Sequence, residues 1–464
     1  MNQHPAPEQR YTLTTAICLI VGICIGSGIF FKSDNILVAT GGNVALGAAM
    51  FLLAATTIVF GGLTLARFAA RTDGHGGLIA YAREFLGPRR MTFIGWHYTF
   101  LYMPAVCAII CWVVGVYACM AFGLEGTFAQ QMVIGLVFLT VCTIWNICWP
   151  TISGYLQNLT TVAKALPLVA VGLIGLALAD PARALVSDIH AAPSAGTGWL
   201  AAAAPIAFAF DGWSSALSIA PELRDAKRNL PRALIVAPLI ILVLYLGYFL
   251  GLSRFLGPQT VMEAGDASLS LMFVRLFGEQ AAALPNIIAL IAVLSTGNGM
   301  VMATLRMPFS LALHNQIPAA RLVGRVNRTL RFPVASALIA YAMTLFWSGV
   351  HALITTFDLL PNGDISEIGV GLTLLILTLF YAHALGDCLR ERQAGTAGWL
   401  RRAVAPAIAI ASSAAIGLSS ISDPTRWPFV LAFLLVPFAA TLLMNRRRGT
   451  QAPAAQAPAA QQTT

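Results

Sequence analysis

Residues 12–38 read TLTTAICLIVGICIGSGIFFKSDNILV, and this stretch decides the fold. It is apolar and long enough to cross a bilayer, but Gly26, Ser27 and Gly28 interrupt it near its middle. Glycine in a helix interior costs about 0.8–1.0 kcal/mol relative to alanine. Because no water reaches the hydrocarbon, a broken helix is tolerated only where protein or a water-filled cavity receives the freed backbone groups. Transporters use such breaks as ligand sites, whereas small residues in membrane helices also serve close packing, and the triplet alone fits both interpretations.

The composition places nearly all of the chain in a membrane. Of 464 residues, 58% are hydrophobic and only 10% are charged, against about 25% charged in soluble proteins. The mean hydropathy is +0.77, and apolar runs repeatedly exceed the length of about 18 residues that is typical of a spanning helix. The eight cysteines lie mostly in apolar runs without a CxxC spacing, so neither a metal nor another cofactor is expected. The sequence predicts an all-α polytopic membrane protein.

Twelve spans are predicted. Their limits are 12–38, 43–68, 92–122, 130–149, 154–179, 198–221, 233–253, 284–313, 333–350, 364–385, 402–421 and 427–444. An even number of spans leaves both termini on one side, and 21 of the 28 Lys and Arg residues fall on that side, against five on the other. The positive-inside rule therefore predicts cytoplasmic termini. This topology also accounts for the net charge of +9, so the lipid bilayer is the expected partner and no nucleic acid is needed.

A second break is predicted in the sixth span, where Phe210 is followed by Asp211 and Gly212. A carboxylate within a membrane is costly unless it is satisfied, and Asp-Gly is typical of turns. We expect the helix to unwind near Phe210 and Asp211 to cap the half-helix that restarts at Gly212. The alternative is a continuous helix in which Asp211 pairs with a neighbour.

The two breaks lie five spans apart, which is the spacing expected of two inverted halves whose broken helices meet at the midplane. Free N–H groups at the start of a half-helix suit a carboxylate, and unwound carbonyls suit an ammonium group. One site with both features favours a zwitterion, and the chemistry therefore points to an amino acid.

Several motifs resemble the amino acid–polyamine–organocation permeases, in particular their L-amino acid transporter branch. They are IGSGIF (25–30), GGLIAYAREFLG (76–87), FDGW (210–213), ELRDAKRNLPRA (222–233) and LSTGNG (294–299) with Arg306. The match covers residues 12–350 well and is weak over the last three spans. The resemblance implies a LeuT-type fold of twelve transmembrane helices, with a five-plus-five inverted repeat, broken helices 1 and 6, and two extra helices. A cytoplasmic tail (1–11) would precede the core (12–385, halves 12–179 and 198–385). Helices 11 and 12 (386–445) and a disordered cytoplasmic tail (446–464) would follow it.

The resemblance also implies roles for single residues in the substrate site. Ser27 and Gly28 would offer backbone N–H groups, and Ser27 also its hydroxyl, to the substrate carboxylate; Gly26 in the same break is a further member of the expected site. The carbonyls of Cys24, Phe208 and Asp211 would accept from the ammonium group, and Phe208 would also act as an aromatic gate. Trp213 completes the expected site, because its ring and that of Phe208 could offer an aromatic face to a cationic side chain, which keeps cationic substrates as an alternative. Ordinary helix packing is the alternative for Phe208.

Three further residues are expected to act in gating or coupling. The resemblance implies that Lys164 stands where sodium-coupled relatives in this superfamily bind an ion, and its ammonium group is expected to tie span five to spans one and eight near Ser295. A lysine snorkelling to the interface is the alternative. Arg306 is expected to bind carbonyls or a carboxylate at the cytoplasmic gate.

The leading hypothesis is a secondary transporter in the cell inner membrane that exchanges neutral L-amino acids without sodium. Proton-coupled amino acid symport and transport of amines or polyamines are alternatives. A receptor or scaffold on the same fold is an alternative from another class. No nucleophile–base pair or phosphate loop favours an enzyme. Monomer and homodimer both remain open.

Overall fold

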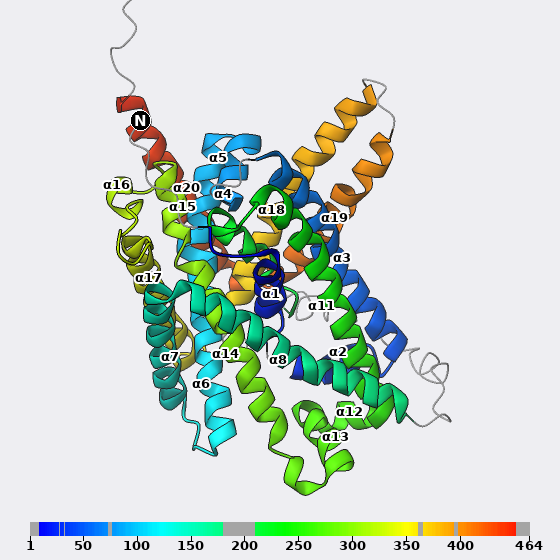
Figure 1. The fold of residues 1–464 in the computed structure, drawn as a ribbon. Helices are drawn as coiled ribbons and strands as arrows, with labels where there is room; N and C mark the ends of the chain where they lie inside the picture. The colour runs from blue at the N-terminus through cyan, green and yellow to red at the C-terminus, as the bar shows by residue number, and fades with distance from the viewer. Residues whose placement is uncertain are drawn as a thin grey trace, which may run out of the picture.

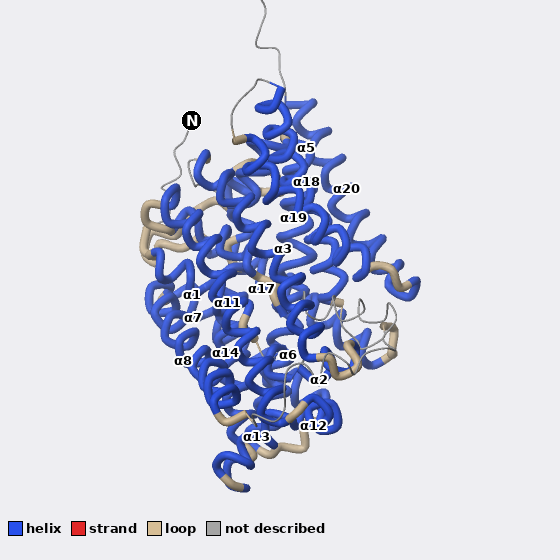
Figure 2. Tube along the Cα trace, turned by 90° about the vertical axis from the view of Figure 1, so that its right-hand side faces the viewer, coloured by secondary structure: helices blue, strands red, loops and turns tan. Residues whose placement is uncertain are grey.

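The computed structural model describes residues 9–26, 28–31, 33–72, 77–179, 209–360, 365–393 and 398–451. Within them the regular elements are helices, and one isolated parallel β-bridge joins Tyr11 to Leu223. The molecule is longer than it is wide, with α5 (Pro88–Trp96) at one end and the short helices α12 (Pro258–Ala264) and α13 (Ser268–Phe277) at the other (Figures 1 and 2).

Ten helices in the described part of the chain are long and apolar enough to cross a membrane. They confirm a multi-pass membrane protein. They are α3 (Val44–Arg71); the continuous segment Pro88–Phe122, made of α5, η3 (His97–Tyr102) and α6 (Met103–Phe122); α7 (Phe128–Cys148); α8 (Pro150–Ala177); α11 (Ala226–Leu256); the segment Glu279–Leu313, made of η7 (Glu279–Ala281), α14 (Leu284–Thr304) and α15 (Met307–Leu313); α17 (Val334–Thr356); α18 (Ser366–Gln393); α19 (Trp399–Ser420); and α20 (Trp427–Gln451), preceded by η9 (Pro424–Arg426).

These ten helices follow ten of the twelve predicted spans in order. The first predicted span is divided into α1 (Leu13–Cys24), the 3₁₀ turn η1 (Gly28–Phe31) and α2 (Ser33–Ala39). The sixth predicted span is described from residue 209 onward and contains the 3₁₀ helix η5 (Trp213–Glu222). The remaining short elements are α4 (Gly77–Tyr81), η2 (Ala82–Leu86), η6 (Gly265–Ala267) and α16 (Ala320–Val323).

Local sequence signals explain where several helices begin and end. Pro88 and Pro150 open α5 and α8, where a missing N–H costs nothing because the first turn has no intrahelical acceptor for it. Thr127 and Gln130 form a reciprocal capping box at the start of α7. Gly123 ends α6 at a φ of 64°, a left-handed conformation that glycine adopts without a steric penalty.

The helix α1 lies at the centre of the molecule and is surrounded by α8, α11, α14 and η5 (Figure 1). Nine of its twelve residues are buried, which is why its sequence is apolar on all sides. These four neighbouring elements therefore enclose the helix that carries the first break.

Two of the surrounding helices, α8 and α11, approach each other through glycines. A Cβ atom added to Gly251 would lie 2.6 Å from the carbonyl oxygen of Val171 and 2.7 Å from the Cα atom of Gly172. Close backbone approach of this kind is a main source of helix association in bilayers, where burial of apolar surface gives little driving force between helices.

The C-terminal helix is longer than the sequence predicted. A disordered tail was expected from residue 446, but α20 continues to Gln451. The arginines at 446–448 are good helix formers and extend α20 beyond its apolar part. The rest of the expected tail, residues 452–464, and residues 1–8 of the expected N-terminal tail lie outside the described residues.

The glycine contact predicts different effects for two glycines one turn apart on α11. Gly251→Ala should lower the thermal stability of the purified protein, because the new methyl group meets the backbone of α8. Gly247→Ala is the matched control, since nothing lies within 4 Å of its added Cβ atom and alanine is the better helix former. Equal melting temperatures for the two variants would contradict the contact.

Candidate functional site

The first break follows directly from the glycine-containing triplet. The helix α1 ends at Cys24, and Ile25 leaves the helical region with φ −78° and ψ 86°. The N–H of Gly26 donates to the carbonyl oxygen of Cys24 at 2.9 Å, and η1 begins at Gly28. The predicted interruption of the first span is therefore present. The Ser27 side chain, which was expected to bind the substrate carboxylate, lies outside the described residues.

The second break differs in detail from the prediction. Gly212, at φ 89°, is the N-cap residue of η5, which is a 3₁₀ helix and has no side-chain capping bond. The Asp211 carboxylate instead accepts hydrogen bonds from the hydroxyl of Tyr102, at 2.9 and 2.8 Å. Asp211 is thus held by a neighbouring helix because Gly212 takes the left-handed position of the cap. Phe208, the expected gate, lies outside the described residues.

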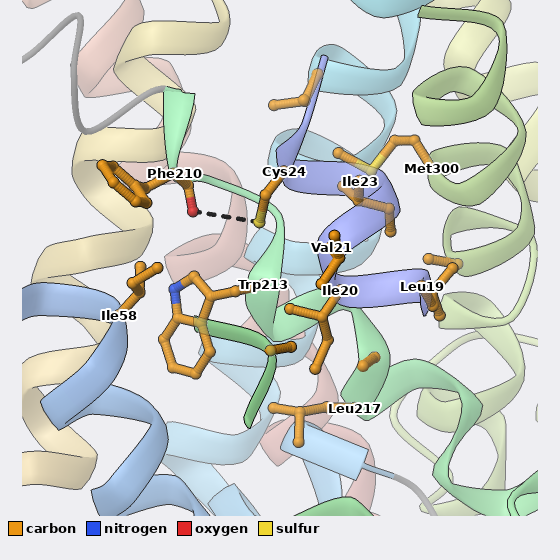
Figure 3. Packing of buried hydrophobic residues seen from close by; sticks show 14 of the residues in the cluster. Leu19, Ile20, Val21, Ile23, Cys24, Ile58, Phe210, Trp213, Leu217 and Met300 are labelled. Atoms are coloured by element: carbon orange, nitrogen blue, oxygen red, sulfur yellow. Dashed lines mark hydrogen bonds between the residues drawn. The ribbon is translucent and has the colours of Figure 1, made fainter. Parts of the chain in front are cut away.

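Tyr245 of α11 joins the two breaks. Its hydroxyl lies 2.7 Å from the carbonyl oxygen of Cys24 and 2.8 Å from that of Ala209. The Cys24 thiol also reaches across to the carbonyl oxygen of Phe210 at 3.5 Å (Figure 3). The Cys24 carbonyl already accepts from Gly26 and Tyr245, which accounts for both of its lone pairs. A substrate ammonium group would have to replace one of these donors.

Lys164 binds the last turns of α1. Its Nζ donates to the carbonyl oxygen of Gly22, lies 3.1 Å from Oγ1 of Thr296, and contacts the carbonyl oxygen of Ala292 at 3.4 Å. The side chain is 1% exposed, so it does not snorkel to an interface. The predicted tie between spans one, five and eight exists, but its member on α14 is Thr296.

Ser295 was expected near Lys164, but the adjacent Thr296 takes that place. Successive side chains on a helix point about 100° apart, so only one of the two can face α1. Its hydroxyl accepts from Thr160 at 2.9 Å. Thr296 faces α1, and its hydroxyl lies 3.0 Å from the carbonyl oxygen of Gly22 and 2.9 Å from that of Ile25.

A cavity of about 170 Å³ adjoins both breaks. Cys24, Gly26 and Gly28 line it from the first break, and Asp211 and Gly212 line it from the second. The helices α6, α14 and α17 supply the other described walls, which are mostly aliphatic. An apolar cavity of about 150 Å³ holds a benzene-sized molecule, so this volume suits a small organic solute.

Gly26 and Gly28 leave open space at the cavity, whereas Trp213 lies apart from it. A Cβ atom added to Gly28 would meet nothing within 4 Å, and one added to Gly26 would meet Thr296 at 3.6 Å. Trp213 is not among the described residues that line the cavity. Its indole is 2% exposed and lies in the core beside Ile58 and Gly61 of α3 (Figure 3), and its role in the site stays a prediction.

A charged cluster lies on the side of the molecule from which α1 starts. Arg306, between α14 and α15, donates to both carboxylate oxygens of Glu222 at the end of η5. Its guanidinium also donates to the Tyr11 hydroxyl at 3.0 Å and to the carbonyl oxygen of Met302. The side chain of Arg10 adds a second cation 3.4 Å from Glu222. Arg306 therefore binds a carboxylate and a carbonyl, as its sequence position suggested, and joins α14 to η5 and to the segment before α1.

Four functional residues escaped the sequence analysis: Tyr102, Tyr245, Thr296 and Glu222. Tyrosines within apolar spans carry no sequence signal that separates a bridging hydroxyl from ordinary packing. Thr296 and Glu222 do lie inside the quoted motifs. The motifs, however, do not show which way these two side chains point. In the described ranges, no group of three or more His, Cys, Asp or Glu side chains is arranged to hold a metal ion.

Comparison with known proteins adds an independent finding. The profile of the family described as "Amino acid permease" matches residues 11–360, well over half of the chain. The chain belongs to the amino acid permease family. The break at Gly26–Gly28, Lys164, the Asp211 region and Arg306 all fall within the matched part of this permease.

Three curated relatives of this permease are named for the amino acids that they transport. The serine/threonine exchanger SteT of Bacillus subtilis is 26% identical over 396 residues, which cover 84% of this chain and 85% of the relative. The b(0,+)-type amino acid transporter 1 of Rattus norvegicus is 30% identical over 248 residues, or 52% and 50% of the two chains. L-asparagine permease 1 of Mycobacterium tuberculosis is 25% identical over 383 residues, or 79% and 76%. The predicted family is confirmed, and these relatives are transporters and not enzymes.

The hydroxyl of Tyr245, which joins the two breaks, predicts how thermal stability and stabilisation by amino acids change when a tyrosine of α11 is replaced by phenylalanine. Tyr245→Phe removes the one hydroxyl hydrogen that the carbonyl oxygens of Cys24 and Ala209 share, a loss of about 0.5–1.5 kcal/mol, and should lower both the melting temperature and the additional stabilisation by bound amino acids. Tyr248→Phe is the control, because its hydroxyl donates to the carbonyl of Phe30 in the turn after the first break and does not join that break to the second. It should lower stability without changing the stabilisation by amino acids. The same ligand response in both variants would refute the bridge.

The charged cluster predicts a large cost for removing one carboxylate. Glu222→Gln leaves the buried Arg306 guanidinium without its counter-ion, and loss of a buried ion pair by this route costs about 3–5 kcal/mol. Glu367→Gln is the control, since its pair with Arg426 is partly exposed and is worth about 0–1 kcal/mol. Denaturation of the purified variants measures the difference. Comparable losses would show that the cluster does not stabilise this conformation.

Proposed function

We propose that this permease is a secondary transporter that exchanges neutral L-amino acids across the cytoplasmic membrane without sodium. The observation that carries the proposal is the cavity that both helix breaks line together. Backbone N–H groups near Gly28 would receive the carboxylate, while carbonyls of Cys24 and Asp211 would receive the ammonium group. The aliphatic walls of α6 and α14 favour a neutral side chain, because a buried unpaired charge is costly.

Alternating access fits the positions of the cavity and the charged cluster. The cluster around Glu222 and Arg306 joins elements on the side where α1 begins, and the cavity lies beyond it at the far end of α1. We assign this conformation to the state that is closed toward the termini. The charge bias of the loops makes that side cytoplasmic, and the full fold is the twelve-helix, five-plus-five arrangement that the permease resemblance implies.

Lys164 supports independence from sodium. Its ammonium group already holds the carbonyl of Gly22 and the hydroxyl of Thr296, at the position where sodium-coupled relatives in the superfamily bind an ion. A fixed positive charge there would supply the same contacts between α1, α8 and α14 that a bound cation supplies. The name of the exchanger among the relatives favours exchange over uniport, and the names of the relatives favour small polar or neutral substrates.

The test is uptake of labelled amino acids into proteoliposomes that contain the purified protein. We expect uptake that depends on unlabelled amino acid inside and is unchanged when choline replaces sodium. Uptake that follows a pH gradient with empty vesicles would favour proton symport instead. Equal competition by amino acid methyl esters would favour an amine carrier, because esters lack the carboxylate. Absence of any amino acid uptake under all of these conditions would overturn the proposal.

A further inference from the structure

A second, much smaller cavity lies against the second break. Its volume is about 10 Å³, which is at the lower end of the roughly 10–15 Å³ that one water molecule needs. Asp211 lines both this cavity and the large one, so it forms part of the wall between them. The other described lining comes from α3, the second break, η5 and α18, and it includes Ile58, Phe210 and Trp213 (Figure 3).

Thr57 of α3 lines this small cavity and lacks the hydrogen bond that a buried threonine in a helix commonly makes. On the same helix, the hydroxyl of Thr64 donates to the carbonyl oxygen of Phe60, four residues back, at 2.8 Å. The corresponding acceptor for Thr57 is the carbonyl of Leu53, which already receives the hydroxyl of Thr56 at 2.6 Å. Thr57 is 2% exposed, and its Oγ1 has no hydrogen-bond partner among the described residues. A buried hydroxyl without a partner is costly, so this group requires one.

The carboxylate of Asp211 also accepts fewer hydrogen bonds than it can. A carboxylate has about four acceptor positions. The described side chains supply one hydrogen, from the hydroxyl of Tyr102, whose oxygen lies 2.9 and 2.8 Å from the two carboxylate oxygens. Thr57 and Asp211 thus line one water-sized space, and a water molecule, which both donates and accepts, suits both groups.

Trp213 adds a third polar group to this lining, the indole N–H. In Figure 3 the indole nitrogen is turned toward Ile58, which lines the same cavity. A buried water molecule makes two to four hydrogen bonds, and a hydroxyl, a carboxylate and an N–H donor fit that number. A small cation would use the two oxygen-bearing side chains, but an N–H donor in the lining disfavours it. The lining therefore favours water over a cation.

We propose that this cavity holds one ordered water molecule, which joins the hydroxyl of Thr57 to the carboxylate of Asp211. Thr57 is then a positioning residue. Through the water and Asp211 it restrains the backbone of the second break, where Asp211 and Gly212 line the large cavity. The effect on the substrate rests on the proposed function, whereas the presence of the water does not.

The melting temperature of purified Thr57→Val protein tests the water without any transport measurement. Valine has the shape of threonine but no hydroxyl. With the water bound, the replacement removes one of its partners and should lower the melting temperature. If the hydroxyl had no partner at all, the same replacement would relieve a buried unsatisfied group and raise it. A melting temperature equal to or above that of the wild type therefore overturns the inference.

Exchange of sodium for choline in the same measurement distinguishes water from a cation. The melting temperature of the wild type should be the same in both salts. A stabilisation by sodium that Thr57→Val lacks would place a cation in the cavity and overturn the inference.

Exchange of amino acids in proteoliposomes tests the positioning role. Thr57→Val should raise the KM about threefold to tenfold, which is the value of one neutral hydrogen bond, at an unchanged maximal rate. Thr57→Ser keeps the hydroxyl and should keep the wild-type KM. Thr64→Val is the matched control on α3, because it loses a buried hydroxyl bond within the helix and does not line the cavity; it should also keep the wild-type KM.

An unchanged KM in Thr57→Val, or an equal rise in Thr57→Val and Thr64→Val, overturns the positioning role. A rise in Thr57→Ser of the same size would trace the effect to lost packing and also overturn it. Failure of the wild-type protein to take up any amino acid contradicts the proposed function itself, and the melting temperatures then still decide whether the water is bound.

Discussion

Every backbone group that the two helix breaks release must find a partner within the protein, because the bilayer interior supplies none. This constraint explains which side chains surround α1. Thr296 serves the carbonyls of Gly22 and Ile25, Lys164 serves that of Gly22, and Tyr245 serves that of Cys24. Tyr248 does the same for Phe30 in the turn after the break. Polar residues in three different spans thus have one shared purpose, and without them the interrupted helix would carry several unsatisfied groups in an apolar environment.

The same residues position the cavity. Tyr245 holds the carbonyls of Cys24 and Ala209 within reach of one hydroxyl, which fixes the distance between the two breaks. Tyr102 ends the π-helical segment η3 and donates to the carboxylate of Asp211 at the second break. Inserted π turns re-aim the side chains that follow them, and here the turn brings a tyrosine to the second break. The site is therefore built by α6, α8, α11 and α14, although its candidate ligand-binding groups belong to the breaks.

Composition and motifs were enough to predict the membrane class, the order of the spans and the first break, because glycine content and apolar length act locally. They were also enough to single out Lys164 and Arg306, since a cation within an apolar span requires a partner wherever it lies. They failed where the answer depends on the direction of a side chain. Ser295 and Thr296 are adjacent and both polar, yet only Thr296 faces α1. Trp213 follows Asp211 in the motif, but the left-handed Gly212 turns its indole toward α3.

The restraints on α1 suggest how substrate binding and movement are linked under the proposed function. The segment before α1 is held by the cluster of Tyr11, Glu222 and Arg306, and the far end of α1 is held by Lys164 and Tyr245. A ligand shifts a conformational equilibrium only by its differential affinity for the two states.

An ammonium group that binds the Cys24 carbonyl must displace the Tyr245 hydroxyl or the Gly26 N–H. It therefore exchanges one contact for another and adds little net stability to this state. Binding would then loosen the connection between α1 and α11 while the substrate itself bridges the two breaks. In an empty carrier, by contrast, Tyr245 would keep both breaks joined. Under the proposed function, this asymmetry would favour return of the carrier with a bound substrate over return without one, as exchange requires.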